Sequence, residues 1–344
     1  QRDGWFLPTT LINDAQFTWF YEDKEWSPRN YKNKYRGMVT LREALGKSLN
    51  AATARLAQEV GLDSTRQIAA RLGFTSALPA YPSLALGALE VTPYEVATAY
   101  GTLANNGFYA PTTTVKWITS RTGKVIQSQD TSIDARVHPD DAYAITHLLQ
   151  GVMENGTGAG ARRKGFLLPA AGKTGTTNDY GDAWFVGFTP DLLTVVWVGF
   201  DARSPLELSG GQAALPIWTE FMKRATKGKL PNRFLVPPGM KLVSVDSQTG
   251  LLASSACPNS FEAAFPKGQE PFLPCPYHEP RLRTPYKTLA IPVPAAGAED
   301  TGPTETVNQK EREEGGAEEG VTLSGPSDKS RERRGQQKSW WKIF

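Results

Sequence analysis

Hydrophobic positions in the first half of the chain follow helical spacing between glycine stops. Residues 51–60 and 64–72 are rich in helix formers, and the runs end at Gly61 and Gly73, a common C-cap residue. Two Thr-x-x-Glu sequences are typical of capping boxes, in which a hydroxyl and a carboxylate satisfy amides at a helix start. These two sequences begin at Thr40 and at Thr92, and a helix is expected to start at each. Two further helices are expected over residues 140–154 and 216–227.

From residue 170 the period changes to short strand-like runs. Residues 170–177, 183–188 and 194–200 are separated by Asn-Asp-Tyr-Gly and Thr-Pro-Asp turns. Two tight hairpins imply an antiparallel sheet, in which Asp182 and Trp184 are expected to fix the first hairpin and the core. Helices followed by a meander around one core predict an α+β fold.

The aromatic first 36 residues show little periodicity. We expect an irregular surface segment there, with a short strand at 9–13.

Composition limits the possible functions. The chain has 344 residues, enough for about two domains plus tails, and 40% of them are hydrophobic, which supports a sizeable core. Its net charge is only +3, so nucleic acid is not an expected partner. The longest apolar run, 192–200, is far shorter than the roughly 20 residues that cross a bilayer.

Changes in composition divide the chain into three parts. We expect a main domain over 1–228 and a small accessory unit rich in Pro and containing both cysteines over 229–289, with a strand at 241–246. Residues 290–344 hold few large apolar groups, which predicts a disordered tail. Its end, Lys338–Phe344, is aromatic and basic, and is interpreted as a docking peptide, a weak interfacial anchor or an idle terminus.

The sharpest motif is Lys173-Thr174-Gly175-Thr176. It is not a phosphate-binding P-loop, because Leu167 stands where that loop needs glycine and because a hairpin follows instead of a helix. It fits an edge strand at an acyl-transfer site. There a Lys charge lies near a nucleophile, Thr hydroxyls hold a carboxylate, and the strand edge pairs with an extended peptide.

A second motif, Ser48-Leu49-Asn50, lies at an expected helix break. A hydroxyl that relays a proton and an amide that holds a peptide carbonyl can share one wall of a cleft. Alone the motif is weak, because Ser and Asn are common at helix breaks.

Metal and cofactor chemistry is not expected. Cys257 and Cys275 lack a Cys-x-x-Cys pattern and a nearby His pair. His138 and His147 are interpreted as structural, and His278 as a surface residue.

The two motifs, in this order and 173 − 48 = 125 residues apart, resemble those of the serine acyltransferases that bind penicillin. Longer phrases such as AGKTGTTNDYGDAWFVGFTP and LGALEVTPYEVATAYGTLANNG look like the transpeptidase domain of class A penicillin-binding proteins. The resemblance covers residues 1 to about 225. It implies a penicillin-binding-protein/β-lactamase-like fold, incomplete at its N-terminus, with helices packed on an antiparallel sheet.

The resemblance also implies an activity. Such enzymes cross-link peptidoglycan stem peptides by serine acyl transfer at D-Ala–D-Ala, and β-lactams acylate them. Carried over by position, Ser48 relays protons, Asn50 orients the substrate amide and Lys173 tunes the proton network. The substrate carboxylate is bound at the segment Thr174, Gly175 and Thr176, and the Thr176 N–H is an oxyanion donor.

Further implications concern the surroundings. The resemblance places the chain on the extracytoplasmic face of a membrane, anchored by an upstream segment. There Cys257 and Cys275 are expected to form a disulfide, and the tail is expected to dock cell-wall synthesis partners. The Gly156-Thr157-Gly158 segment resembles a loop near the site, although a plain helix stop explains it equally well.

One motif of this family is missing from its expected place: no Ser-x-x-Lys precedes Ser48. Thr113–Lys116 has the spacing but starts with Thr, and is interpreted as a strand. We expect the nucleophile to precede Gln1 and the chain as given to be inactive. Two alternatives stay open: a DD-carboxypeptidase or β-lactamase-type hydrolase, and a catalytically dead peptide-binding or scaffolding module.

Overall fold

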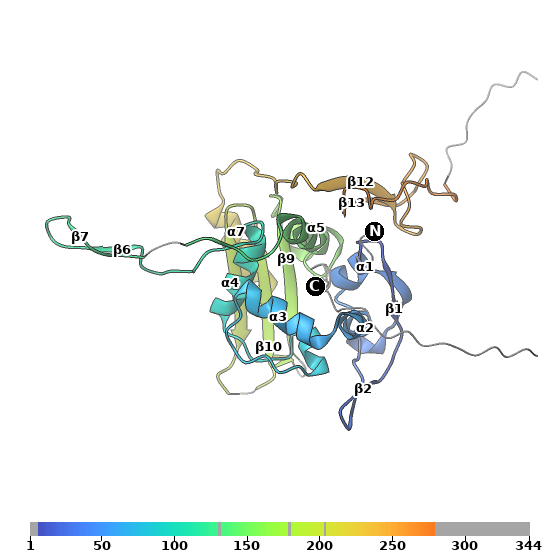
Figure 1. Cartoon of the computed structure of the whole chain (residues 1–344), viewed down its shortest axis with the longest axis horizontal. Coiled ribbons are helices and arrows are strands. Elements are labelled where there is room, and N and C mark those ends of the chain that lie inside the picture. The colour runs from blue at the N-terminus through green and yellow to red at the C-terminus, as the bar shows by residue number, and fades with distance from the viewer. Residues whose placement is uncertain (1–5, 130–131, 178–179, 203, 279–344) are drawn as a thin grey trace, which may run out of the picture. The chain divides into compact units, whose positions relative to one another are not determined.

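The computed structural model describes residues 6–129, 132–177, 180–202 and 204–278 (Figure 1). These residues form one unit in which helices combine with small antiparallel sheets, so the expected α+β class is confirmed. The tail predicted at 290–344, with its terminal Trp-Trp segment, lies outside the described residues. Within the described ranges, no helix has the length and apolar character needed to cross a membrane.

Strands occupy much of the N-terminal segment, where an irregular path was expected. β1 (Leu11–Asp14) pairs with β4 (Gly37–Thr40), and β2 (Trp19–Tyr21) forms a hairpin with β3 (Lys24–Trp26). The prediction failed because tertiary contacts decide this segment: Trp19 packs against the buried Ala54 and Ala57 of one helix, and its ring lies 6.3 Å from that of Trp26 across the hairpin.

The helices expected from the pattern are present, with ends shifted by a few residues. They are α1 (Leu41–Gly46), α2 (Asn50–Val60), α3 (Leu62–Leu72), α4 (Pro93–Ala104), α5 (Pro139–Asn155) and α7 (Ala214–Ala225). A short α6 (Gly160–Arg163) and two 3-10 turns at Tyr31–Asn33 and Pro82–Leu86 add to them.

Only one of the two expected capping boxes is complete. At α4 the Thr92 hydroxyl accepts a hydrogen bond from the Glu95 N–H, and the Glu95 carboxylate accepts one from the Thr92 N–H. At α1 the Thr40 hydroxyl accepts from the Glu43 N–H, but the Glu43 carboxylate pairs with Arg36 at 3.2 Å instead of returning to Thr40. An exposed carboxylate thus bonds an arginine that folding brings near it.

The two histidines of α5 are structural. His138 caps the helix through Nδ1, which accepts from the Asp140 N–H at 3.3 Å. Burial, reinforced by the nearby charge of Arg42, lowers the pKa of His147 to about 4, so this side chain is neutral at physiological pH.

The central sheet is the predicted meander. β9 (Ala171–Thr176), β10 (Asp182–Phe188) and β11 (Leu193–Gly199) are antiparallel in the order β11-β10-β9, with Lys173 opposite Val186. Asp182 fixes the β9–β10 hairpin as expected, because its N–H donates to Thr177 Oγ1 at 2.8 Å, and its carboxylate also accepts from the Trp197 indole of β11 at 2.9 Å. β9 is therefore an edge strand of this sheet.

Helices cover both faces of the sheet. Phe188 packs among residues of α3, α4 and α5, whereas Phe185, on the opposite face, meets α7. Trp218 of α7 is fully buried 5.0 Å from the Phe185 ring, and its indole donates to the Gly187 carbonyl. Gly187 is required there, because a Cβ would lie 2.7 Å from Trp218.

Four short strands lie between α4 and α5. β5 (Phe108–Tyr109) pairs with β8 (Asp134–Ala135), and β6 (Trp117–Thr119) with β7 (Val125–Ser128). The strand expected at Thr113–Lys116 is wrong, since this exposed segment is a loop leading into β6.

The accessory hairpin consists of β12 (Met240–Asp246) and β13 (Ser260–Pro266). The strand expected at 241–246 is confirmed. The hairpin packs on α5, where Met240 and Ala264 meet Tyr143 and Ala144.

Glu95 links the start of α4 to the loop after α3, and this link predicts acid sensitivity. Its carboxylate, only 4% exposed, accepts six hydrogen bonds from Thr75, Ser76 and Thr92. Burial raises the pKa of Glu95, but these donors outweigh it and hold the pKa well below the usual range. A depressed folded-state pKa gives stability that is complete above the unfolded pKa of about 4.3 and is lost as pH falls below it.

We therefore expect Glu95→Gln to lower the free energy of unfolding by about 1–3 kcal/mol at neutral pH, because buried donors lose an ionised acceptor. The variant should also have a flatter stability profile below the ordinary Glu pKa. Urea unfolding across that range measures both, with the exposed Glu25→Gln as control. Equal acid sensitivity in wild type and E95Q would contradict this account.

Candidate active site

The turn after α1 presents Ser48 to solvent. α1 ends at Gly46, and Leu49, only 7% exposed, anchors the chain in the core formed with α2. Ser48 lies between these buried neighbours with a φ of 54°, in the left-handed region that residues with a side chain rarely adopt. Such strained positions are frequent at functional sites.

Lys173 of β9 joins this turn. Its Nζ donates to Ser48 Oγ at 2.8 Å and to the Thr174 carbonyl at 3.0 Å. The first bond connects groups 125 residues apart in sequence and brings the two sequence motifs into one site. The amine of one motif therefore contacts the hydroxyl of the other directly.

Burial lowers the pKa of Lys173 to about 8. At neutral pH the side chain is mostly the ammonium, yet it releases a proton more readily than an exposed lysine does. A lysine with a pKa this close to neutrality is suited to hold an anionic group and to pass a proton through the Ser48 hydroxyl.

Both motif threonines are hydrogen-bonded at the edge of β9. Thr174 Oγ1 lies 2.7 Å from Thr157 Oγ1, and Thr176 Oγ1 accepts from the Gly210 N–H at 3.0 Å. Thr157 thus belongs to the site, although its sequence context was equally explained by a helix stop. Gly210 was missed altogether, because nothing in the sequence relates it to β9.

The N–H of Thr176 is available at the outer edge of β9. The neighbouring Thr177 N–H donates toward β10, to the Asp182 carbonyl at 3.1 Å. Successive residues of an antiparallel strand point their peptide groups to opposite sides, so Thr176 points away from β10. This edge can pair with an extended peptide.

Asn50 occupies the first turn of α2. Its Nδ2 donates to the Arg29 carbonyl at 2.8 Å, which fixes the amide plane. Among the described residues its Oδ1 has no hydrogen-bond partner. Asn50 therefore lies two residues from Ser48 with an acceptor available, but no hydrogen bond joins it to Lys173.

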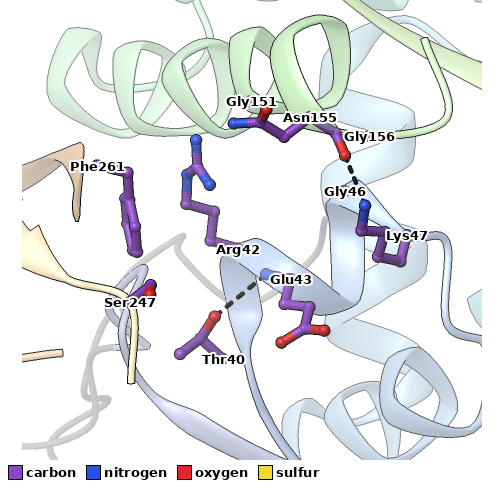
Figure 2. Close-up of a pocket in the computed structure, with 10 residues that line it drawn as sticks. All are labelled: Thr40, Arg42, Glu43, Gly46, Lys47, Gly151, Asn155, Gly156, Ser247 and Phe261. Carbon is purple, nitrogen blue, oxygen red and sulfur yellow. Dashed lines mark hydrogen bonds between the residues drawn. The ribbon is translucent and has the colours of Figure 1, made fainter. Parts of the chain in front are cut away.

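A tight contact between α1 and α5 holds the Ser48 turn in place. The Thr157 N–H donates to the Gly46 carbonyl at 3.0 Å. A Cβ on Gly156 would lie 2.4 Å from that oxygen, so only glycine permits the approach. Lys47 Nζ donates to the Asn155 carbonyl at 2.6 Å, where a cation also suits the C-terminus of α5 (Figure 2).

A pocket lies behind this contact, between α1, α5 and the accessory hairpin (Figure 2). Arg42 extends through it, with its guanidinium 4.2 Å from the Phe261 ring and close to Gly151. Ser48, Lys173 and the motif threonines do not line the pocket. The pocket therefore lies where the hairpin meets the helices that carry the site, and it is not the site itself.

The cysteines lie elsewhere, in the accessory unit. Cys257 and Cys275 are free thiols in the structure, and their pairing stays a prediction. The surface position expected for His278 is wrong: its side chain is only 20% exposed and lies 3.2 Å from Asp246. Folding of the hairpin brings Asp246 and His278 together, although they are far apart in the sequence.

The Lys173–Ser48 bond predicts a measurable titration. Lysine-selective 13C labelling should show one ε-carbon that titrates at about pH 8, assigned by its absence in Lys173→Met. Ser48→Ala should shift this titration to lower pH, because the charged form loses a hydrogen-bond acceptor. An unchanged pKa in S48A would mean that the contact carries no energetic weight.

Comparisons with known proteins agree with this geometry. Residues 2–223 match the penicillin binding protein transpeptidase domain, and residues 236–280 match the C-terminal domain of penicillin-binding protein 1A. The second match covers the accessory hairpin and both cysteines.

Relatives of known name are penicillin-binding proteins 1A. The protein of Aquifex aeolicus is 36% identical over 255 residues, which are 73% of this chain and 34% of that protein. The protein of Pseudomonas aeruginosa is 32% identical over 327 residues, covering 78% of this chain and 39% of its relative. The chain thus spans about a third of the length of these relatives.

Solved structures show the same fold. The penicillin-binding protein 1A of Haemophilus influenzae superposes with a TM-score of 0.71 at 27% identity, over 79% of this chain and 46% of that one. A penicillin-binding protein of Mycobacterium tuberculosis, also solved with penicillin V, gives 0.59 at 25% identity over 68% and 70% of the two chains. On the domain match, the relatives and the fold together, this chain belongs to the penicillin-binding protein transpeptidase family.

Proposed function

We propose that this chain supplies the donor-binding wall of a DD-transpeptidase site, which cross-links peptidoglycan stem peptides at D-Ala–D-Ala and is acylated by β-lactams. The observation that carries the proposal is the 2.8 Å bond from Lys173 Nζ to Ser48 Oγ, made beside the unpaired edge of β9. Family membership supports the reaction class.

The donor peptide would lie along β9 as an added strand. Its terminal carboxylate would meet the hydroxyls of Thr174 and Thr176 and the charge of Lys173. The carbonyl under attack would accept from the Thr176 N–H, an oxyanion contact of a kind that lowers a barrier by about 3–4 kcal/mol. Asn50 Oδ1 would accept from the substrate amide.

Proton transfer would run through Ser48. When a nucleophilic serine attacks the penultimate D-Ala carbonyl, the C–N bond to the terminal D-Ala breaks and the departing nitrogen takes a proton. Ser48 Oγ, bonded to Lys173, can donate that proton and recover one from the ammonium, and the proton that the attacking hydroxyl gives up reprotonates Lys173. An acceptor amine then displaces the serine, and the proton that the amine loses returns to the serine oxygen.

We infer that the nucleophile is not among the residues of this chain, since no Ser-x-x-Lys precedes Ser48 and the one match to that spacing, Ser339–Lys342, lies in the C-terminal tail. We therefore propose that the 344-residue chain alone is not acylated. We further propose the boundaries 1–228 and 229–289 for its domains, an extracytoplasmic location with an upstream membrane anchor, and cell-wall synthesis partners for its tail.

The test is intact mass after incubation with excess penicillin, on this chain and on one extended upstream to include a Ser-x-x-Lys. Only the extended chain should gain one covalent adduct. In that background Lys173→Met should slow acylation by about 100-fold or more, as expected for loss of a group that transfers protons. The exposed Lys164→Met is the matched control.

Other outcomes would decide between the alternatives. An adduct on the short chain would refute its inactivity and make Ser48 the first residue to test. No adduct on either folded chain would replace the proposal with a peptide-binding module. Release of free acid instead of a cross-linked product, in the presence of an acceptor amine, would favour the hydrolase.

A further inference from the structure

Four potential metal ligands converge in the accessory unit, outside the acyl-transfer site. Asp246 ends β12, Cys257 lies in the connection to β13, and Cys275 and His278 follow β13. One ligand atom from each lies within 4.8 Å of every other. We propose that Asp246, Cys257, Cys275 and His278 form a structural Zn²⁺ site.

The spacing of the donors fits a single ion. Cys275 Sγ lies 3.3 Å from His278 Nδ1, which lies 3.2 Å from Asp246 Oδ2. Zinc bonds of about 2.0–2.3 Å at tetrahedral angles place two ligand atoms about 3.3–3.8 Å apart. A small inward movement of the remaining ligand atom completes the tetrahedron.

Asp246 provides independent support, because half of its carboxylate is left without a hydrogen bond in a buried place. Oδ1 accepts from the N–H groups of Gln248 and Thr249 and from the Thr249 hydroxyl, at 2.9–3.1 Å. Oδ2 accepts no hydrogen bond from a backbone N–H or a hydroxyl among the described residues, although Asp246 is only 1% exposed, and the groups that face it are two of the other proposed ligands, His278 Nδ1 at 3.2 Å and the Cys257 thiol. A buried, unsatisfied carboxylate oxygen is costly unless a cation meets it.

The sulfur atoms have the surroundings of metal-bound thiolates. Cys257 Sγ accepts from the Ser254 N–H at 3.3 Å. Cys275 Sγ is buried, with its residue only 1% exposed, and lies 3.3 Å from His278 Nδ1. Thiolate, imidazole and carboxylate donors in tetrahedral array select zinc over the hard cations.

The accessory unit also needs such a link. Its own hydrophobic cluster contains only three buried residues, Val245, Ala263 and Phe265. Apart from Gly250 and Cys275, every residue of the segments 247–259 and 267–278 is exposed or half-buried, so apolar burial does little to hold them. A unit with so small a core depends on a staple. Zinc would join the end of β12, the connection and the segment after β13 at one point.

The test uses the full 344-residue chain, reduced and freed of metal with a chelator. Native mass spectrometry with added Zn²⁺ should show one ion per chain, and Zn²⁺ should raise the thermal midpoint. Asp246→Asn and Cys275→Ser should weaken Zn²⁺ binding by at least about 10-fold in competition with a chromogenic chelator. The exposed Glu262→Gln on β13 and His138→Ala at α5 are matched controls.

A second readout does not depend on the variants folding. Co²⁺ added to the reduced wild-type chain should give sulfur-to-cobalt charge-transfer absorption, which requires thiolate ligands. The proposal fails if the reduced chain binds no Zn²⁺, or if D246N and C275S bind it as tightly as wild type. It also fails if the chain as isolated has the mass of a disulfide and takes up no metal after reduction.

Discussion

The site rests on one close contact between backbones, where the end of α5 meets the end of α1. Gly156 lies so near the Gly46 carbonyl that a Cβ would be 2.4 Å from it, and the Thr157 N–H bonds the same oxygen. This contact fixes the position of the Ser48 turn and of Thr157 at the same time. On the α1 side the next turn exposes Ser48, and on the α5 side Thr157 reaches Thr174. Both ends of the contact therefore face β9.

β9 serves the core on one side and the site on the other. Toward the sheet it pairs with β10 and needs glycine, because a Cβ on Gly172 would lie 2.8 Å from the Val186 carbonyl. Toward the outer edge it carries Lys173 and the Thr176 N–H, which has no backbone partner among the described residues. Helices pack on both faces of the sheet behind this edge, and the proposed acyl transfer would depend on such support for groups that must meet a developing charge.

Lys173 illustrates how burial and hydrogen bonding oppose each other. Burial alone lowers its pKa, since charge is costly away from water, while the acceptors Ser48 Oγ and the Thr174 carbonyl favour the ammonium. The balance leaves a lysine that is charged at neutral pH but can give up a proton. In the accessory hairpin the Asp246 carboxylate is also buried, and among the described residues only side chains of the proposed metal site face its Oδ2.

α5 connects the two regions. Its C-terminal end positions Thr157 at the site, and its N-terminal half packs against the accessory hairpin through Tyr143 and Ala144. Arg42 of α1 adds a second link through its contact with Phe261. A staple in the hairpin would thus stabilise the surface on which α1 and α5 meet.

The sequence by itself determined the α+β class, most helices, the three-stranded meander and the two motifs, because these follow from local periodicity, caps and turns. It did not predict the β2–β3 hairpin or the half-formed box at Thr40, where distant partners override local preference. It left Thr157 open between a loop near the site and a plain helix stop, and it could not place Gly210 or the Asp246 cluster, whose residues have no common period or spacing. Only tertiary packing decided that Lys173 meets Ser48 and that Asp246 meets His278, since contacts between distant segments form where the backbone, not the local sequence, brings them together.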